Sequence, residues 1–303
     1  MPQQLPALSL VAVPGRRRAT LEIAREIERR GYPAIYAPSL FDNMALCAAL
    51  AHVTERIEFG TAIVPIYARR AVDVAESAAF LHEVASGRFR LGLGVSHAPA
   101  HARMGVTPGK PLQDVRAYIA QLRAERGIGE LPPIYLAALR RQMIALAGEI
   151  ADGLLIANGA RSHMAASLAA LPAAKRDDRN FFIGNMIPTC ISDDVAAARA
   201  VNRKTLTRYA LLANYRNYWK EAGYVEEMCA IEKAIDEGRT AEVQSYLTDA
   251  WLADCTLFGP PRRVREGIEA WRAAGVTMPI LVPSSVAGNQ LTAIAEVFAA
   301  FAD

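Results

Sequence analysis

Short apolar runs alternate with amphipathic segments along almost the whole chain. Eight runs have the length of β-strands, and they cover residues 8–13, 34–37, 57–66, 89–95, 134–137, 154–157, 181–191 and 279–282. Strands that are buried on both faces of a parallel sheet have such continuous apolar runs. Because eight strands close a barrel, the pattern predicts an α/β protein with a (β/α)₈ (TIM) barrel.

The segments between the runs have the periodicity of helices. The first places Ile23, Ala24 and Ile27 on one face and ends at Gly31. The others are expected at 44–53, 72–85, 113–126, 141–150 and 264–274, and a terminal helix is expected after strand eight, to about residue 301. Residues 193–255 look helical throughout and exceed the length of one crossover. We therefore expect a helical insertion between strands seven and eight of a single barrel domain, residues 1–303.

Glycine and proline mark three local features. Residues 96–112 contain three prolines and two glycines, which predicts a long loop. Pro188 is expected to end the regular ladder of strand seven. Gly92 and Gly94 are poor strand formers, which indicates close approach by another backbone or by a ligand. The alternative fold, an open doubly wound sheet, often carries GxGxxG after strand one, but Pro14-Gly15-Arg16 stands there instead.

Composition narrows the class of protein. The chain has 303 residues, of which 52% are hydrophobic and 21% charged, which supports a well-buried core. A net charge of +3 is too small to indicate nucleic-acid binding. No apolar stretch approaches the ~18 residues of a membrane span, and the N-terminus lacks the basic start of a signal peptide. Four widely spaced cysteines and five histidines predict neither disulfides nor a metal site. We expect a cytoplasmic enzyme that acts on a small molecule.

In (β/α)₈ barrels the working face is the C-terminal end of the strands. Many arginines follow strand ends here, namely Arg16, Arg17, Arg18, Arg69, Arg70, Arg103, Arg140, Arg141 and Arg161. The guanidinium fork suits phosphate and carboxylate groups, which favours an anionic ligand. The other interpretation is that these are ordinary solvated arginines of loops, and the sequence does not decide between the two.

The residues that are missing from this face also matter. Strand four runs into Val95-Ser96-His97 and strand seven ends at Thr189-Cys190, so no carboxylate pair of a retaining glycosidase stands there. The lysines lie in loops or helices, away from the position of a Schiff-base lysine. No GxSxG nucleophile elbow occurs. This pattern is typical of a barrel in which a cofactor performs the chemistry.

Several segments resemble the luciferase-like family of flavin-type oxidoreductases. They occur in the expected order and cover most of the chain: TERIEFGT at 54–61, RRA at 69–71, SGRFRLGLG at 86–94, AGEIADG at 147–153 and GPP at 259–261. Gly94-Val95-Ser96-His97 and the loop behind it look most like the deazaflavin-dependent branch. The resemblance therefore favours coenzyme F420 over FMN as the cofactor.

The resemblance implies a cofactor ring at the C-terminal mouth, above a non-proline cis peptide in strand three near Thr61, Ala62 and Ile63. Ser39 and Ser96, which follow strands two and four, would also contact the cofactor. The loop after strand six would hold the cofactor phosphate with backbone N–H groups. Its residues are Ala157, Asn158, Gly159, Ala160 and Arg161.

The chain departs from the family pattern at two places. Val95 stands where the sugar-phosphate dehydrogenase branch has its catalytic acid, and Pro38-Ser39 where an acidic residue and a histidine often occur. Glucose-phosphate oxidation by that mechanism is therefore not expected. Asp42 could replace the missing acid, or it could cap the following helix.

His97 is the first candidate to carry a proton and His101 the second, because both follow strand four and imidazole titrates near neutral pH. Either could instead be a loop histidine bonded to a carbonyl. Tyr67 could donate a hydrogen bond to substrate or could pack in the core. Aromatic residues of the insertion could shape a substrate pocket or pack the insertion together: Tyr209, Tyr215, Tyr218 and Trp219.

Three functions remain open. The first is F420-dependent hydride transfer to or from a small organic substrate. The second is an FMN-dependent monooxygenase that uses oxygen and a separate reductase. The third is a non-catalytic flavin-binding barrel. The family resemblance also implies a homodimer.

Overall fold

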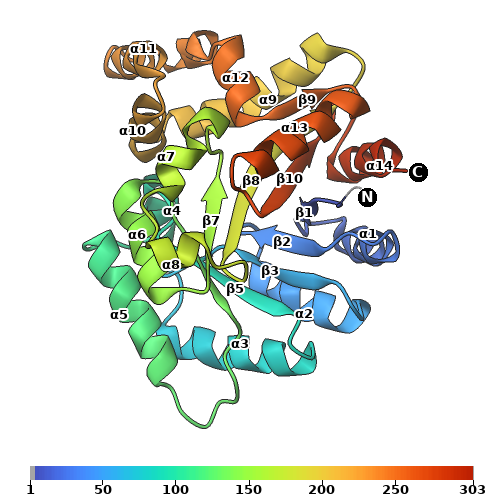
Figure 1. Ribbon diagram of the computed structural model, residues 1–303, viewed down its shortest axis with the longest axis vertical. Helices are drawn as coiled ribbons and strands as arrows, with labels where there is room; N and C mark the ends of the chain where they lie inside the picture. The colour runs from blue at the N-terminus through green and yellow to red at the C-terminus, as the bar shows by residue number, and fades with distance from the viewer. Residues whose placement is uncertain (1–3, 303) are drawn as a thin grey trace. The chain divides into compact units, whose positions relative to one another are not determined.

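The computed structural model describes residues 4–302 and contains parallel strands with helices between them (Figure 1). The strands are β1 (Ala7–Ser9), β2 (Ala34–Pro38), β3 (Glu58–Ala62), β4 (Val64–Pro65), β5 (Phe89–Gly94), β6 (Ile134–Ala137), β7 (Gly153–Ala157), β8 (Phe182–Ile191), β9 (Leu257–Gly259) and β10 (Met278–Ser284). β4 continues β3 after one residue, and β9 is a short strand beside β8. The other eight are the strands of a (β/α)₈ barrel, so the predicted fold class is confirmed.

The helices lie where the periodicity predicts, with additional short ones. They are α1 (Arg17–Arg29), α2 (Asn43–Val53), α3 (Ala71–Val84), α4 (Ala98–Met104), α5 (Pro111–Ala124), α6 (Arg141–Ile150), η1 (Arg161–His163), α7 (Met164–Leu168), α8 (Ala173–Arg176), α9 (Val195–Ala210), α10 (Ala213–Glu221), α11 (Val225–Asp236), η2 (Thr240–Tyr246), α12 (Asp249–Cys255), α13 (Pro261–Ala273) and α14 (Gln290–Ala300). The helical insertion is therefore confirmed, with α9 to α12 between β8 and β10.

The chain divides into two compact units. Unit 1 holds residues 1–155 and 169–184, and unit 2 holds residues 156–168 and 185–303. The expectation that residues 1–303 form one domain stays a prediction.

In unit 1 the strands are hydrogen-bonded in the order β1, β2, β3, β5, β6, β7 (Figure 1). Their apolar residues are buried because each strand has neighbours on both sides and helices over its outer face. α1 buries Thr20, Ala24 and Ile27, which is the face predicted from the sequence. At the C-terminal end of β2, Pro38 is in register with Ala62 of β3.

Two glycines of β5 allow a backbone to come close. A Cβ at Gly92 would lie 1.9 Å from the carbonyl oxygen of Thr61, and one at Gly94 would lie 3.0 Å from Cγ1 of Ile63. The Thr61 hydroxyl donates to Gly92 O and accepts from Gly92 N, both at 2.9 Å. The close approach expected at these glycines is therefore made by the backbone of Thr61 at Gly92 and by the side chains of Ala137 and Ile63 at Gly94.

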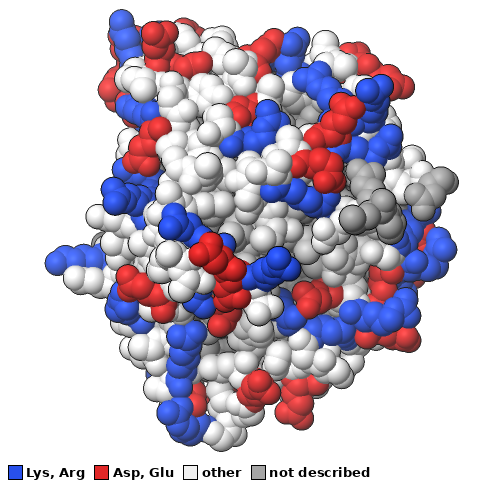
Figure 2. Space-filling model, viewed as in Figure 1, with Lys and Arg blue, Asp and Glu red and all other residues white. Residues whose placement is uncertain are grey.

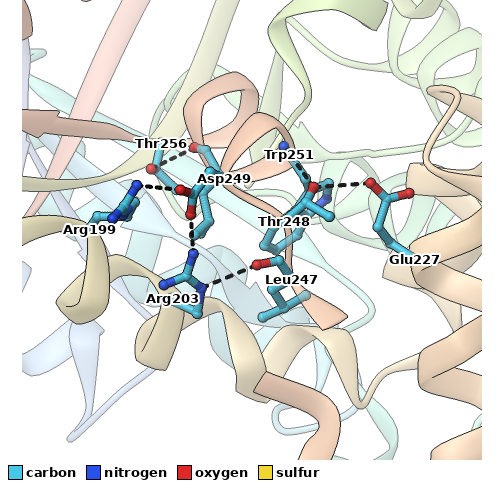
Figure 3. Close-up of polar contacts among 9 residues, drawn as sticks. Arg199, Arg203, Glu227, Leu247, Thr248, Asp249, Trp251 and Thr256 are labelled. Carbon is cyan, nitrogen blue, oxygen red and sulfur yellow. Dashed lines mark hydrogen bonds and ion pairs between the residues drawn. The ribbon is translucent and has the colours of Figure 1, made fainter. Parts of the chain in front are cut away.

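In unit 2, β8 pairs with β9 and with β10, and the insertion helices are joined by polar contacts. Asp249 of α12 forms ion pairs with Arg199 and Arg203 of α9 (Figure 3). The Thr248 hydroxyl donates to Glu227 of α11 at 3.0 Å and also caps α12 (Figure 3). One short segment thus connects three helices of the insertion.

The structure corrects three local expectations. The stretch 96–112 is not a loop throughout, because α4 forms within it. Its alanines favour helix, Pro99 lies in the first turn, where proline is tolerated, and Gly105 ends it with φ 66°. Pro188 does not end strand seven, since β8 continues to Ile191 and pairs there with β9. β9 itself was not predicted, because a strand of three residues is too short to show a periodic pattern in the sequence.

The surface face in Figure 2 carries interspersed basic and acidic side chains. Several ion pairs of the chain join residues three or four apart on one helix, such as Arg262 with Glu266. Among residues 4–302, no helix has both the length and the apolar character to cross a membrane. The same residues contain no cluster of His, Cys, Asp and Glu arranged to hold a metal ion.

Candidate functional site

The end of strand three has an unusual backbone. A cis peptide joins Ala62 to Ile63, which separates β3 from β4 and confirms the position implied by the family resemblance. Thr61 and Ala62 are buried, whereas Ile63 is partly exposed. Because Gly94 leaves room for the Ile63 side chain, the sequence of β5 permits this turn of the backbone.

Asn43 holds this backbone in place and was not singled out from the sequence. Its side-chain amide is buried and donates to the carbonyl oxygens of Ala37 and Ile63, each at 3.1 Å. The end of β2 and the interruption of β3 are thereby tied to the first residue of α2. The sequence feature that could have identified Asn43 is its position as a polar residue at the start of an apolar, Ala-rich helix.

His97 and His101 lie at the start of α4, directly after β5. Burial, and secondarily the neighbouring His101, lowers the pKa of His97 below the ordinary value of histidine. His101 Nε2 lies 2.6 Å from the carbonyl oxygen of Val95. A carbonyl can only accept, so the proton is on Nε2 and only Nδ1 is left for another partner.

Tyr67 and Asp42 have partners within unit 1. The Tyr67 hydroxyl donates to Asp114 at 2.6 Å, and its ring meets His101 edge-on with centroids 5.4 Å apart. Asp42 accepts from Ala45 N at the start of α2 and from Arg69 Nη2 at 3.1 Å. Asp42 therefore has the capping role that the sequence allowed, and its carboxylate is about half exposed.

Ser39 and Ser96 are partly buried at the ends of β2 and β5, and Ser96 has φ 64°. The arginines of unit 1 that follow strand ends are all exposed: Arg16, Arg17, Arg18, Arg69, Arg70, Arg103, Arg140 and Arg141. Their exposure fits the solvated-loop interpretation better than a shared anion site.

The loop after β7, residues 157–161, lies in unit 2, and its residues are more buried than expected. Asn158, Gly159 and Ala160 are buried. Their backbone N–H groups donate within the protein, to Met186 O at 3.0 Å, to Asn185 Oδ1 at 3.4 Å and to the Tyr218 hydroxyl at 3.0 Å. The N–H groups of these three residues are thus engaged within the protein, and their expected contact with the cofactor phosphate stays a prediction.

Insertion residues determine the shape of this loop. Trp219 Nε1 donates to the carbonyl oxygen of Asn158 at 3.2 Å, and the Asn158 side chain hydrogen-bonds to Tyr209 and Tyr215. Burial raises the pKa of Tyr218 to about 12, so its hydroxyl is neutral where it meets Ala160. The aromatic group therefore packs the insertion against the loop, with Tyr215, Tyr218 and Trp219 all buried.

Asp254 of α12 accepts hydrogen bonds from Ser162 in η1. This buried carboxylate accepts from Ser162 N at 2.9 Å, from Ser162 Oγ at 2.6 Å and from the Tyr224 hydroxyl at 2.9 Å. The chain thus places its own anion at the position where helix N–H groups could otherwise receive one. The sequence offers no local signal for this contact, since the partners are 92 residues apart.

The two groups of residues fit a flavin-type cofactor to different degrees. The backbone from Thr61 to Ile63 contains the cis peptide and is partly exposed at Ile63, so a ring could lie on it. His97 follows the end of β5. On the phosphate side the N–H groups of residues 158–160 are engaged, but two side chains of the loop can still donate. Asn158 Nδ2 is buried without an acceptor, and the Arg161 side chain has no hydrogen bond or ion pair among the described residues.

Comparisons with known proteins show which family the chain resembles. The sequence profile of a family described as luciferase-like monooxygenase matches residues 6–278. A Mycobacterium tuberculosis protein with the provisional name coenzyme F420-dependent oxidoreductase is 26% identical, over 87% of this chain and 90% of its own. The 5,10-methylenetetrahydromethanopterin reductase of Methanolobus tindarius is 24% identical, over 89% of this chain and 91% of its own.

Two solved structures share the fold. An F420-dependent secondary alcohol dehydrogenase, in complex with an F420-acetone adduct, superposes with a TM-score of 0.73 at 17% identity and covers 99% of this chain and 100% of its own. The FMN-bound oxygenating constituent of 3,6-diketocamphane monooxygenase from Pseudomonas putida gives 0.60 at 16% identity, over 91% and 92%.

Proposed function

Because the chain belongs to the luciferase-like monooxygenase family, we propose that it is an oxidoreductase that transfers a hydride between F420 and a small organic substrate. The observation that carries the proposal is the buried amide of Asn43, which joins the ends of β2 and β3 by donating to the carbonyl oxygens of Ala37 and Ile63. The F420-dependent names among the relatives favour F420 over FMN. The FMN-bound structure has the lower TM-score of the two.

When bound, F420 supplies a ring carbon that donates or accepts hydride in place of the oxygen-reactive nitrogen of a flavin. Ala62 and Ile63 would support the ring, and Asn43 keeps their backbone in one conformation. Ser39 follows β2 and Ser96 follows β5, the two strands on either side of β3, and both residues would orient polar groups of the cofactor. Arg161 would hold the phosphate through its side chain.

His97 is the residue we propose to move the proton. Its lowered pKa keeps the imidazole neutral at pH 7, and a neutral imidazole is ready to accept a proton from a substrate that loses a hydride. His101 is the second candidate, through Nδ1 only, because Nε2 is bonded to Val95. Tyr67 donates to Asp114 and Asp42 is held by Arg69 and the α2 cap, so neither is assigned the proton.

Direct titration of the purified chain with F420 and, separately, with FMN tests the proposal through cofactor fluorescence. We expect saturable F420 binding and much weaker FMN binding. FMN binding alone would contradict the proposal and favour the monooxygenase. Failure to bind either cofactor would remove the basis for any flavin-type function, and F420 binding without turnover on any donor or acceptor would favour the non-catalytic barrel.

A further inference from the structure

Unit 2 contains a cavity of about 300 Å³ that lies beside α13. One wall is a single face of this helix, since Arg263, Glu266, Gly267 and Ala270 are spaced by three or four residues. The other wall comes from the end of α12, the start of β9 and the residue that begins η1; these residues are Ala253, Thr256, Leu257, Phe258 and Arg161.

The lining carries unbalanced positive charge. The side chains of Arg161 and Arg263 have no ion pair or hydrogen bond with another residue in the described part of the chain. The single acidic residue of the lining, Glu266, is bonded at 2.7 Å to Arg262, which does not line the cavity. Two arginines without counter-ions, at one cavity, favour a negatively charged ligand.

The surroundings position these arginines without neutralising them. The Arg263 guanidinium carbon lies 4.5 Å from the centroid of the Phe258 ring, which orients it and leaves its donors free. Gly267 lets α13 approach β9 closely, because a Cβ there would lie 2.4 Å from Leu257. Leu257, Phe258 and Ala270 are apolar residues of the wall, while Arg263 and Glu266 are exposed to solvent.

The backbone next to the cavity is largely occupied. Ser162 N and Oγ are bonded to Asp254, and the N–H groups of residues 158–160 are bonded to other acceptors. Arg161 is the point where this occupied loop meets the cavity. An anion that binds on this side is therefore held mainly by arginine side chains.

We infer that this cavity is an oxyanion site in which Arg161 and Arg263 bind a phosphate group through their guanidinium donors. The group is either free phosphate or the phosphate of the cofactor. Only the second source rests on the proposed function. In both cases the ligand is a monoanion or dianion with several acceptor oxygens. The paired N–H donors of two guanidinium groups can bond to these oxygens.

Calorimetric titration of the full chain with inorganic phosphate, in buffer whose sole other anion is chloride, tests the inference. We expect a Kd of about 1 mM or tighter. Arg161→Gln and Arg263→Gln should each bind at least about tenfold more weakly, because each loses a charged hydrogen-bond donor. Glu266→Gln should bind more tightly, because it removes the negative charge of the lining and frees Arg262.

Arg208→Gln is the matched control, since Arg208 is an exposed arginine of unit 2 outside the cavity, and it should bind phosphate like the wild type. Wild-type binding no stronger than that of the Arg161→Gln, Arg263→Gln double variant would overturn the inference, provided that circular dichroism shows both proteins folded. Equal binding by the single variants and the control would do the same.

A second titration distinguishes the sources. If saturating F420 weakens phosphate binding, the cofactor phosphate occupies the cavity, and if F420 leaves the Kd unchanged, free phosphate is the ligand. Since the first titration needs no cofactor, failure of F420 to bind would count against the proposed function alone.

Discussion

At the scale of single residues, buried polar side chains hold backbone segments that are distant along the chain. Gly92, Gly94 and the stretch 61–63 stand out in the sequence, and the structure brings them together. Asn43, Asn185 and Asp254 did not stand out, because each acts on backbone that is distant along the chain. A buried polar residue takes its meaning from a tertiary contact, and one sequence does not reveal such a contact.

His97 gives a prediction about pH. Its folded-state pKa lies below the unfolded value of about 6.5, so the unfolded chain binds more protons between the two values. The free energy of unfolding should therefore fall as the pH drops below about 6.5, and this dependence should be smaller in His97→Gln. Urea unfolding monitored between pH 8 and pH 5 measures it. His52→Gln, at an exposed position on α2, should keep the wild-type dependence.

The same variant tests the role in proton transfer. His97→Gln should bind F420 like the wild type but turn over a substrate, once one is found, at least about a hundredfold more slowly. Unchanged turnover with unchanged F420 affinity would exclude His97 as the proton carrier.

At the scale of elements, the sequence predicted most of the fold because periodicity and breakers coincide. β6 and α6 have the predicted bounds, since Pro132-Pro133 stand before the strand and Asp152-Gly153 follow the helix. The misses, α4 and β9, are short elements whose stability comes from neighbours and not from their own pattern. The role of the insertion was also not predictable, because its aromatic residues act on a loop about 60 residues earlier.

Tyr218 gives a prediction at this scale. Tyr218→Phe removes the acceptor of Ala160 N and leaves a buried N–H group without a partner. We expect a loss of about 1–3 kcal/mol in the free energy of unfolding, together with weaker F420 binding. Tyr246→Phe is the control, because that hydroxyl bonds to the partly exposed or exposed Arg239 and Glu242 and should cost about 0.5 kcal/mol or less. Equal losses in the two variants would show that the loop does not depend on Tyr218.

At the scale of the whole molecule, the main question is whether the two units fold together. β7 and β8 each contribute residues to both units, so neither unit can unfold without disrupting strands that continue into the other. The three tryptophans, Trp219, Trp251 and Trp271, all lie in unit 2. Their fluorescence reports unit 2 alone, whereas far-ultraviolet circular dichroism reports both units.

We therefore expect urea unfolding curves from tryptophan fluorescence and from circular dichroism to coincide, as a single domain requires. Separate midpoints would show that residues 1–303 behave as two domains. The homodimer implied by the family resemblance stays a prediction.

The contact between Trp219 and the carbonyl of Asn158 has a consequence for how such proteins diverge. Asn158, Gly159 and Ala160 are fixed by atoms of Tyr218, Trp219 and Asn185, so a change on one side alone leaves a buried polar group without a partner. Mutations at these separated positions should consequently be tolerated in pairs. Among descendants of a common ancestor, the loop and the insertion should be inherited as one unit, even where the sequence between them drifts freely.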